Sequence, residues 1–408
     1  MQSAESQPVA VSIRTRTDLA AVALAFLIIM VDGFDLQAIG YVAPEIALTW
    51  SVPLSGFGPV FAAALAGSIV GALMAGLITR RIGLRISLAF ALLLFGALTL
   101  STPWATSLST LGALRLFAGV GLGAAVPIAV GLVARRSASQ WRATFMTLTL
   151  CGQPIGAILG GALCTRLIPL YGWQSAFYLG GVLPLLLATA LSWLSPRDGE
   201  RTDSTDGSSP AVNGRFVELF NSDLRMTTLI LPGCAFVSSG FLYIIINWLP
   251  GVMRGAGYSL SDSVLAVSVF NFGGIFGGLA GARFMDRFGP FKVLSPLYVI
   301  AALSTGLLGP LIADRSLLLV AACISGLAGY GAALNLGPLA VMLYPPTLHT
   351  LGIGWALGVG RLGAVIGPWA VGLLLAAGFA TGHLFYVAAA ATLTAVVCLS
   401  TLAGTGEF

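Results

Sequence analysis

"SPRDGERTDSTDGSSPAVNGR", the stretch from Ser195 to Arg215, is rich in Ser, Asp, Gly and Arg and cannot bury a hydrophobic core. This composition is typical of a flexible linker rather than of a packed element. On both sides of the linker the chain consists of long apolar blocks joined by short connections. The linker therefore divides the chain into two halves of similar length.

Each apolar block is long enough to cross a membrane as a helix, which takes about 20 residues. Only 9% of the 408 residues are charged, and the mean hydropathy is +0.95. The blocks are continuous rather than alternating, which excludes a membrane β-barrel. The sequence predicts an all-α integral membrane protein with twelve transmembrane helices in two pseudo-symmetric six-helix bundles. The expected spans are 19–47, 55–78, 84–103, 108–134, 143–166, 173–194, 226–250, 261–284, 291–313, 316–343, 350–376 and 382–403.

Basic residues outside the spans gather at one face of the predicted membrane domain. Cytoplasmic loops carry the excess of Lys and Arg, so we expect both termini and the linker in the cytoplasm and the chain in the inner membrane. The net charge of +5 reflects this bias and not nucleic-acid binding. The other face holds only Arg166, Arg254 and Arg315. The cytoplasmic face holds Arg14, Arg16, Arg80, Arg81, Arg85, Arg135, Arg136, Arg142, Arg197, Arg201, Arg215, Arg225, Arg283, Arg287 and Lys292.

The predicted organisation follows from the spans and their orientation. The polar N-terminal residues are not followed by a short apolar region with a cleavage site, so we expect no signal peptide. The expected parts are a cytoplasmic tail 1–18, a six-helix bundle 19–194, a cytoplasmic linker 195–225, a second six-helix bundle 226–403 and a cytoplasmic tail 404–408.

Enzymatic and metal chemistry are not expected. The five cysteines lie in apolar stretches at irregular spacing, which fits neither a disulfide framework nor a zinc site. The two histidines, His349 and His383, make no metal site without further ligands. No aqueous segment carries a Ser–His–Asp arrangement, and "GVGLG" lacks the strand and the GK[ST] of a phosphate-binding loop. We therefore predict neither a metal nor a cofactor.

The two halves repeat each other. Arg81 and Gly83 match Arg287 and Gly289 at a separation of 206 residues, and "GAILG" (156–160) matches "GAVIG" (363–367) at 207. "GLGAA" (121–125) matches "GYGAA" (329–333) at 208. A nearly constant separation close to half the length indicates a duplicated six-helix unit. Such repeats are typical of secondary transporters, whose substrate site lies between the halves near the membrane midplane.

Two motifs carry a resemblance to a known family. "GLITRRIGLR" (76–85) resembles the major facilitator superfamily signature that lies between spans 2 and 3. "RLFAGVGLGAAVP" (115–127) resembles the superfamily's motif in span 4. "DGFDLQAIG" (32–40), "NWLP" (247–250) and "GIGWALGVGRLGAVIGP" (352–368) are similar to the aromatic acid:proton symporters. This second resemblance implies import of benzoate-, hydroxybenzoate- or hydroxyphenylpropionate-type acids, and the superfamily implies a monomer that alternates access by rocking its bundles.

The sequence departs from the family's pattern at the cytoplasmic side. An acidic residue is usual where Arg80 and Arg135 stand, and an arginine is usual where His349 stands. In relatives these charges help to hold the cytoplasmic side closed. We infer that the clamp of the first half is rewired, so that Arg80 and Arg135 face anionic lipid headgroups, while Asp286, Arg287 and Lys292 keep the clamp of the other half. The alternative is sequence drift in a poorly working paralogue. The expected cytoplasmic gate comprises Arg80, Arg81, Arg85, Arg135, Asp286, Arg287, Lys292 and His349.

Asp32 and Asp35 lie inside the first span, where a charge costs about 2.5–3.5 kcal/mol. They are three residues apart and project from nearly the same helix face, and Gly33 between them allows a neighbouring helix to approach closely. Two nearby carboxylates disfavour joint ionisation. We predict that the pair carries the coupled proton. In the alternative, one or both are static partners of an arginine or cap a helix break near Gly33.

Arg115 in span 4 and Arg361 in span 11 are the other charges placed well inside the membrane. A guanidinium binds a carboxylate through two parallel hydrogen bonds, so each could hold a substrate or neutralise an aspartate. We assign Arg361 to the substrate carboxylate and Arg115 to pairing with the Asp32/Asp35 region.

An aromatic substrate also needs an apolar slot with a few polar contacts. Each candidate for this slot could equally be a packing contact between helices. The candidates are Gln153, Tyr243, Asn247, Tyr330, Asn335 and Trp355.

The predicted function is proton-coupled import of a monocyclic aromatic carboxylate by alternating access, in a lipid bilayer and with no nucleic-acid partner. Two alternatives remain at this point. One is a carrier of another small organic anion, a sugar or a drug. The other is a membrane sensor that binds aromatic acids without transporting them.

Overall fold

The computed structural model describes residues 18–138, 141–191, 216–221, 224–345 and 348–404, all of them in helices or short connections without a strand. The predicted tails, apart from Asp18 and Gly404, and residues 195–215 of the linker lie outside these ranges. In the described chain, eleven helices are long and apolar enough to cross a membrane, and the apolar helix Gln174–Ala190 is shorter. The all-helical membrane fold is therefore confirmed.

The helices of the first half keep the predicted spans to within a few residues, except in the fifth. They are α1 (Leu19–Trp50), η1 (Leu54–Phe57), α2 (Gly58–Ile82), α3 (Leu84–Ser101), η2 (Thr102–Trp104), α4 (Leu108–Arg136), α5 (Arg142–Leu150), α6 (Gly152–Tyr171) and α7 (Gln174–Ala190). The fifth span is interrupted between α5 and α6. Pro154 has no N–H to donate to the Leu150 carbonyl, and its ring crowds that carbonyl.

The second half follows the same plan, and its interruption falls in the tenth span. Its elements are η5 (Phe216–Phe220), α8 (Arg225–Gly255), α9 (Leu260–Phe288), α10 (Pro290–Leu308), η6 (Pro310–Ala313), α11 (Arg315–Ser325), η7 (Gly326–Tyr330), α12 (Gly331–Leu334), α13 (Leu336–Leu343), α14 (His349–Ala376) and α15 (His383–Gly404). The segment η7 is a π-helix. The break after Leu334 lies four residues before Pro338, for the same reason as the break in the fifth span.

Gly83 and Gly289 end the matching helices α2 and α9 with positive φ values of 82° and 89°. Only glycine adopts this conformation without steric cost. Each residue turns the chain directly into the next helix, α3 or α10. The sequence match at these two positions thus corresponds to the same turn in each half.

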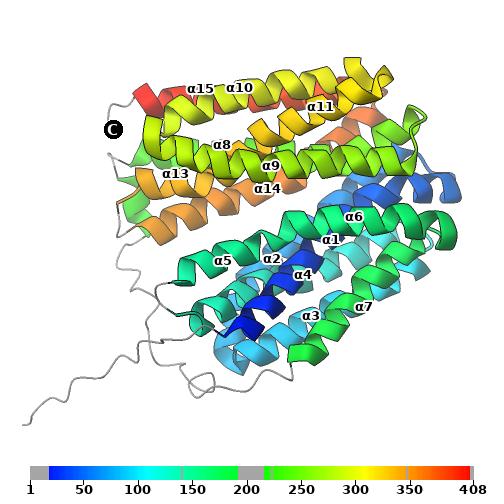
Figure 1. Ribbon diagram of the computed structural model, residues 1–408, viewed down its shortest axis with the longest axis horizontal. Helices are drawn as coiled ribbons and strands as arrows, with labels where there is room; N and C mark the ends of the chain where they lie inside the picture. The colour runs from blue at the N-terminus through cyan, green and yellow to red at the C-terminus, as the bar shows by residue number, and fades with distance from the viewer. Residues whose placement is uncertain (1–17, 139–140, 192–215, 222–223, 346–347, 405–408) are drawn as a thin grey trace, which may run out of the picture.

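The two halves form two groups of helices with matching packing (Figure 1). In the first half α2 packs on α4, α1 on α6 and α3 on α7. In the second half α9 packs on the segments α11, η7 and α12, while α8 packs on α14 and α10 on α15. The repeated glycines make these contacts, since Gly156 lies against the Met30 carbonyl of α1 and Gly363 against the Phe236 carbonyl of α8.

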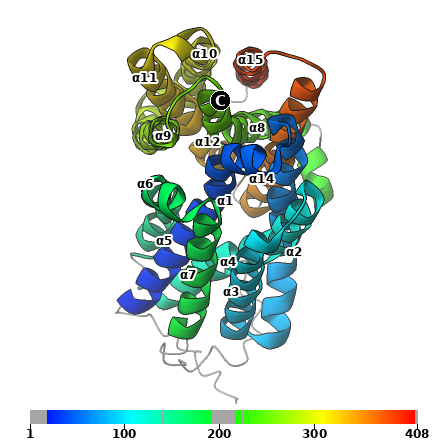
Figure 2. The same ribbon diagram turned by 90° about the vertical axis from the view of Figure 1, so that its right-hand side faces the viewer.

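Contacts between the two bundles gather at one end of the molecule. We call this the distal end, where α1 and α8 finish, and we call the end where both helices begin the proximal end. The bundles meet where α2 packs on α14, α6 on α9 and α1 on α8, and Figure 2 shows α6 beside α9 and α14 beside α2. A Cβ built on Gly40 would lie 2.8 Å from the Ile246 carbonyl, and one on Gly58 3.1 Å from the Gly372 Cα. The distal end is therefore closed.

Candidate functional site

Asp32 lies near the middle of α1, where α6 approaches it closely. The carboxylate is 5% exposed and accepts a hydrogen bond of 2.9 Å from Gln153 Nε2. Gly33 permits this approach, because a Cβ at that position would collide with the Gln153 carbonyl. Gly33 thus permits the close approach of a neighbouring helix that the sequence predicts. Gln153, predicted as a residue of the substrate slot, contacts Asp32.

Asp35 has a different set of partners. Arg115 Nη1 donates to both oxygens of Asp35, at 3.1 and 3.2 Å, and Arg115 Nη2 donates to the hydroxyls of Thr99 and Thr102. The guanidinium also lies 5.1 Å from the ring centre of Phe177. Arg115 is 1% exposed and Asp35 is 5% exposed. This is a buried ion pair inside the first bundle, as expected for an arginine that pairs with the Asp32/Asp35 region. A proton-carrying role for Asp35 stays a prediction.

Side chains from both bundles lie within electrostatic range of Asp32. Its carboxylate interacts electrostatically with Asp35 and Arg361, and Tyr243 and Tyr330 interact electrostatically with it in turn. These residues come from α1, α8, η7 and α14, and Gln153 adds α6. The structure thus places five predicted site residues within electrostatic or hydrogen-bond range of a sixth, Asp32, where the two bundles face each other.

Arg361 differs from Arg115 in its surroundings. Its side chain is exposed, and it forms no ion pair with any residue that the structure describes. A guanidinium keeps its charge and has five N–H donors. Arg361 is therefore a cation within electrostatic range of Asp32 that makes no ion pair with a described residue, and its substrate role stays a prediction.

Three predicted slot residues lie outside this cluster or at its edge. Asn335 donates to the Gly278 and Gly331 carbonyls and is a packing contact with α9. Trp355 donates to the Thr228 carbonyl near the start of α8. Asn247 donates to the Tyr243 carbonyl one turn away, and its buried side-chain oxygen has no hydrogen-bond partner among the described residues. Substrate contact by these three residues remains a prediction.

The predicted gate residues occupy the helix ends at the proximal end. Arg80, Arg81, Arg135, Asp286, Arg287 and Lys292 are exposed, and Arg85 is half-buried. None of the six exposed residues forms an ion pair with a residue in the described ranges. The His349 side chain lies outside the described residues. Their gating role stays a prediction.

Sequence reasoning missed an amide pair between the bundles. Gln37 Nε2 donates to Asn271 Oδ1 at 3.1 Å, and Asn271 Nδ2 donates back at 3.0 Å. The Tyr41 hydroxyl also donates to Gln37. Two polar amides inside apolar spans are a signal of interhelical contact, but their pairing across 234 residues needs the fold.

Gly33→Ala is expected to lower the melting temperature of the purified protein in detergent. The new Cβ would meet the Gln153 backbone, and overpacking of this kind costs about 1–3 kcal/mol. Gly76→Ala is the matched control, because nothing lies within 4 Å of a Cβ at that position. Equal melting temperatures for the two variants would contradict the close approach of α6.

Comparison with known protein families shows to which family this chain belongs. The sequence pattern of the Major Facilitator Superfamily matches this chain over residues 25–334 and again over residues 233–405. The chain belongs to the Major Facilitator Superfamily. Among superfamily members it is similar to the 4-hydroxybenzoate transporter PcaK of Pseudomonas aeruginosa, with 32% identity over 88% of this chain and 86% of that protein. It is also similar to the 3-(3-hydroxy-phenyl)propionate transporter of Escherichia coli, with 32% identity over 91% of this chain and 90% of the relative.

Solved structures of superfamily transporters share the fold. The nucleoside transporter NupG aligns with a TM-score of 0.76 and 13% identity, covering 94% of this chain and 99% of that one. A D-xylose-proton symporter aligns with a TM-score of 0.75 and 16% identity, covering 93% and 97%. At these identities the likeness supports the fold alone.

Proposed function

We propose that the protein is a carrier that imports a monocyclic aromatic carboxylate together with a proton. The observation that carries this proposal is that Asp32 and Arg361, one from each bundle, lie within electrostatic range of each other. Asp32 is a buried carboxylate with no cation at hydrogen-bond distance in the described chain. Arg361 is a cation that forms no ion pair within the described part of the chain, and relatives at 32% identity are named for aromatic acid transport.

The coupling step follows from charge neutralisation. A buried charge without a partner is costly, so a proton on Asp32 and a carboxylate on Arg361 each remove one charge from the region between the bundles. The doubly loaded site is then less costly to close away from water. A half-loaded site keeps one uncompensated charge and resists closure, which prevents leakage of either solute alone. In the empty site Asp32 and Arg361 offset each other's charge, so the empty carrier can close and return.

The closed distal end supports an assignment of this conformation to one stage of the proposed transport cycle. With the basic helix ends at the proximal end, the positive-inside bias puts that end in the cytoplasm. The described conformation is then inward-facing, in the inner membrane, with both termini in the cytoplasm. The bundles 19–194 and 226–403 rock about the site as units, the linker 195–225 joins them, and the monomer is the working form.

Uptake into proteoliposomes tests the proposed function. With an inward proton gradient, purified protein should accumulate labelled 4-hydroxybenzoate or 3-hydroxyphenylpropionate, and a protonophore should abolish that accumulation. The panel should include cis,cis-muconate, because a cis,cis-muconate transport protein of Acinetobacter baylyi is 26% identical over 87% of this chain. Uptake of muconate alone would favour a carrier of another organic anion, and binding without accumulation would favour a sensor.

A further inference from the structure

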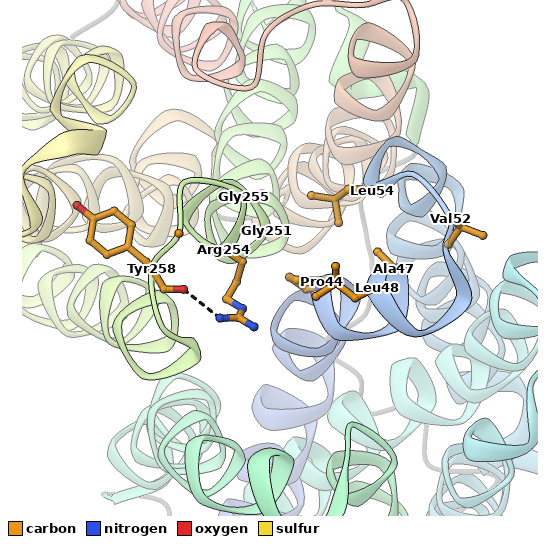
Figure 3. A pocket seen from close by; sticks show the side chains of 10 residues that line it. Pro44, Ala47, Leu48, Val52, Leu54, Gly251, Arg254, Gly255 and Tyr258 are labelled. Atoms are coloured by element: carbon orange, nitrogen blue, oxygen red, sulfur yellow. Dashed lines mark hydrogen bonds between the residues drawn. The ribbon is translucent and has the colours of Figure 1, made fainter.

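A pocket of about 370 Å³ opens at the distal end, on the seam between the two bundles. Ligand pockets in proteins commonly measure about 300–1,000 Å³. Pro44, Leu48 and Leu54 supply an apolar wall from the first bundle, while Arg254 and Tyr258 come from the second (Figure 3). The pocket therefore combines an apolar surface with a single guanidinium, which is the chemistry that recognises a ring carrying a carboxylate.

Arg254 has donor capacity left over. Its Nη1 donates to the Tyr258 carbonyl at 3.0 Å, and its Nη2 donates to Glu45 Oε1. The Nε is buried and has no partner in the described part of the chain. Carboxylates prefer to engage a guanidinium through two adjacent N–H groups. Glu45 uses one oxygen, so a free carboxylate that contacted both Nε and Nη2 would bind with better geometry.

The Glu45–Arg254 ion pair also connects the two bundles. Of the ion pairs between two described residues, this one alone joins the two bundles. Asp35–Arg115 and Asp18–Arg136 lie within the first bundle, and Asp262–Arg315 lies within the second. A ligand that displaces Glu45 from Arg254 removes this link at the closed end.

We propose that this pocket is a capture site for a ring carboxylate, in which the carboxylate of the ligand replaces Glu45 on Arg254 and unlocks the distal end. The site is separate from the Asp32–Arg361 region, and it rests on the proposed function in that the captured ligand is the transported acid. Arg254 then binds the carboxylate of the arriving acid. The apolar pocket wall formed by α1 and η1 selects against acids that lack an apolar ring.

The test compares transport from the two sides of the membrane, using right-side-out and inside-out vesicles and labelled 4-hydroxybenzoate. Arg254→Gln should raise the KM in right-side-out vesicles by about tenfold or more, since a charge-assisted hydrogen-bond pair is lost. The KM in inside-out vesicles should change no more than it does in Glu45→Gln, which breaks the same link between the bundles without removing the cation. Glu45→Gln should lower the right-side-out KM, because the competing carboxylate is gone.

Exchanging the charges of Glu45 and Arg254 distinguishes a ligand-binding role of Arg254 from the role of a structural ion pair. Glu45→Arg with Arg254→Glu keeps the link between bundles but removes the cation from its place, and the right-side-out KM should stay high. The matched control exchanges Asp262 and Arg315, an ion pair at the same end within one bundle, and should leave both KM values unchanged. A charge exchange that restores the original KM would overturn the proposal.

Two further outcomes keep the result decisive. If the exchanged variant does not reach the membrane, Arg254→Lys keeps the charge without the two-donor edge, and an unchanged KM in that variant would also overturn the capture site. If the unmodified protein takes up no ring acid, the proposed function fails and this site with it. Uptake by the unmodified protein with unaltered KM in all Arg254 variants would remove the capture site alone.

Discussion

Asp32→Asn is expected to abolish proton-driven accumulation of a ring acid while leaving exchange of labelled for unlabelled acid intact. The amide imitates the protonated carboxylate in charge and shape, so the site can close when substrate is bound, but no proton is carried. A pH gradient of about one unit supplies roughly 1.4 kcal/mol per proton, which is about a tenfold accumulation ratio. The variant should show no accumulation above equilibrium in proteoliposomes.

The control for this prediction is Gln153→Glu, measured in the same assay. Gln153 donates its only described side-chain hydrogen bond to Asp32, and a carboxylate in its place would compete for the same proton. Accumulation should weaken in this variant without being lost, because Asp32 remains. Full accumulation by Asp32→Asn would show that the proton travels elsewhere.

Arg115→Gln is expected to have the largest effect on stability. The change leaves the buried Asp35 carboxylate without its cation, and breaking a buried pair from one side costs about 3–5 kcal/mol. Two threonine hydroxyls also lose their donor, because Arg115 Nη2 donates to both Thr99 and Thr102. The melting temperature in detergent should fall well below that of the unmodified protein.

The double variant Arg115→Gln with Asp35→Asn tests whether the loss comes from the orphaned charge. It buries no charge, so most of the lost stability should return. Asp32→Asn serves as the comparison, since it leaves the Arg115 pair in place and should melt near the unmodified protein. A double variant as unstable as Arg115→Gln would show that packing of the arginine, and not its charge, stabilises the bundle.

Much of the fold could be predicted because apolar length decides where a helix crosses a bilayer. The predicted spans and the duplicated turns at Gly83 and Gly289 follow from residues that act locally. The interruptions of the fifth and tenth spans were not predicted, although Pro154 and Pro338 carry the signal four residues after each break. An apolar block hides such a break, because its hydropathy does not change there.

The candidate site was predictable by residue type but not by partner. A buried charge in a span marks a functional position, which is how Asp32, Asp35, Arg115 and Arg361 were selected. Spacing on one helix could not reveal that Asp35 belongs to Arg115 and Asp32 to Gln153. That division depends on α4 and α6 approaching α1 from different sides, which is information that only the packing of distant segments contains.

The contacts between bundles were missed for the same reason. Gln37 pairs with Asn271, and Glu45 pairs with Arg254, across more than half of the chain. Nothing near either residue in the sequence indicates its partner. Trp355 and Asn335 were selected as slot residues, but both donate hydrogen bonds to backbone carbonyls. Residue types that suit a ligand slot also suit such structural hydrogen bonds.

The central claim is that Asp32 carries the coupled proton, and measuring the proton flux tests it most directly. Adding 4-hydroxybenzoate to proteoliposomes in weakly buffered medium should raise the external pH as protons enter with the acid. Asp32→Asn should give no pH change while still exchanging labelled acid at a rate close to that of the unmodified protein. A pH rise in Asp32→Asn equal to that of the unmodified protein would contradict the assignment of the coupled proton to Asp32.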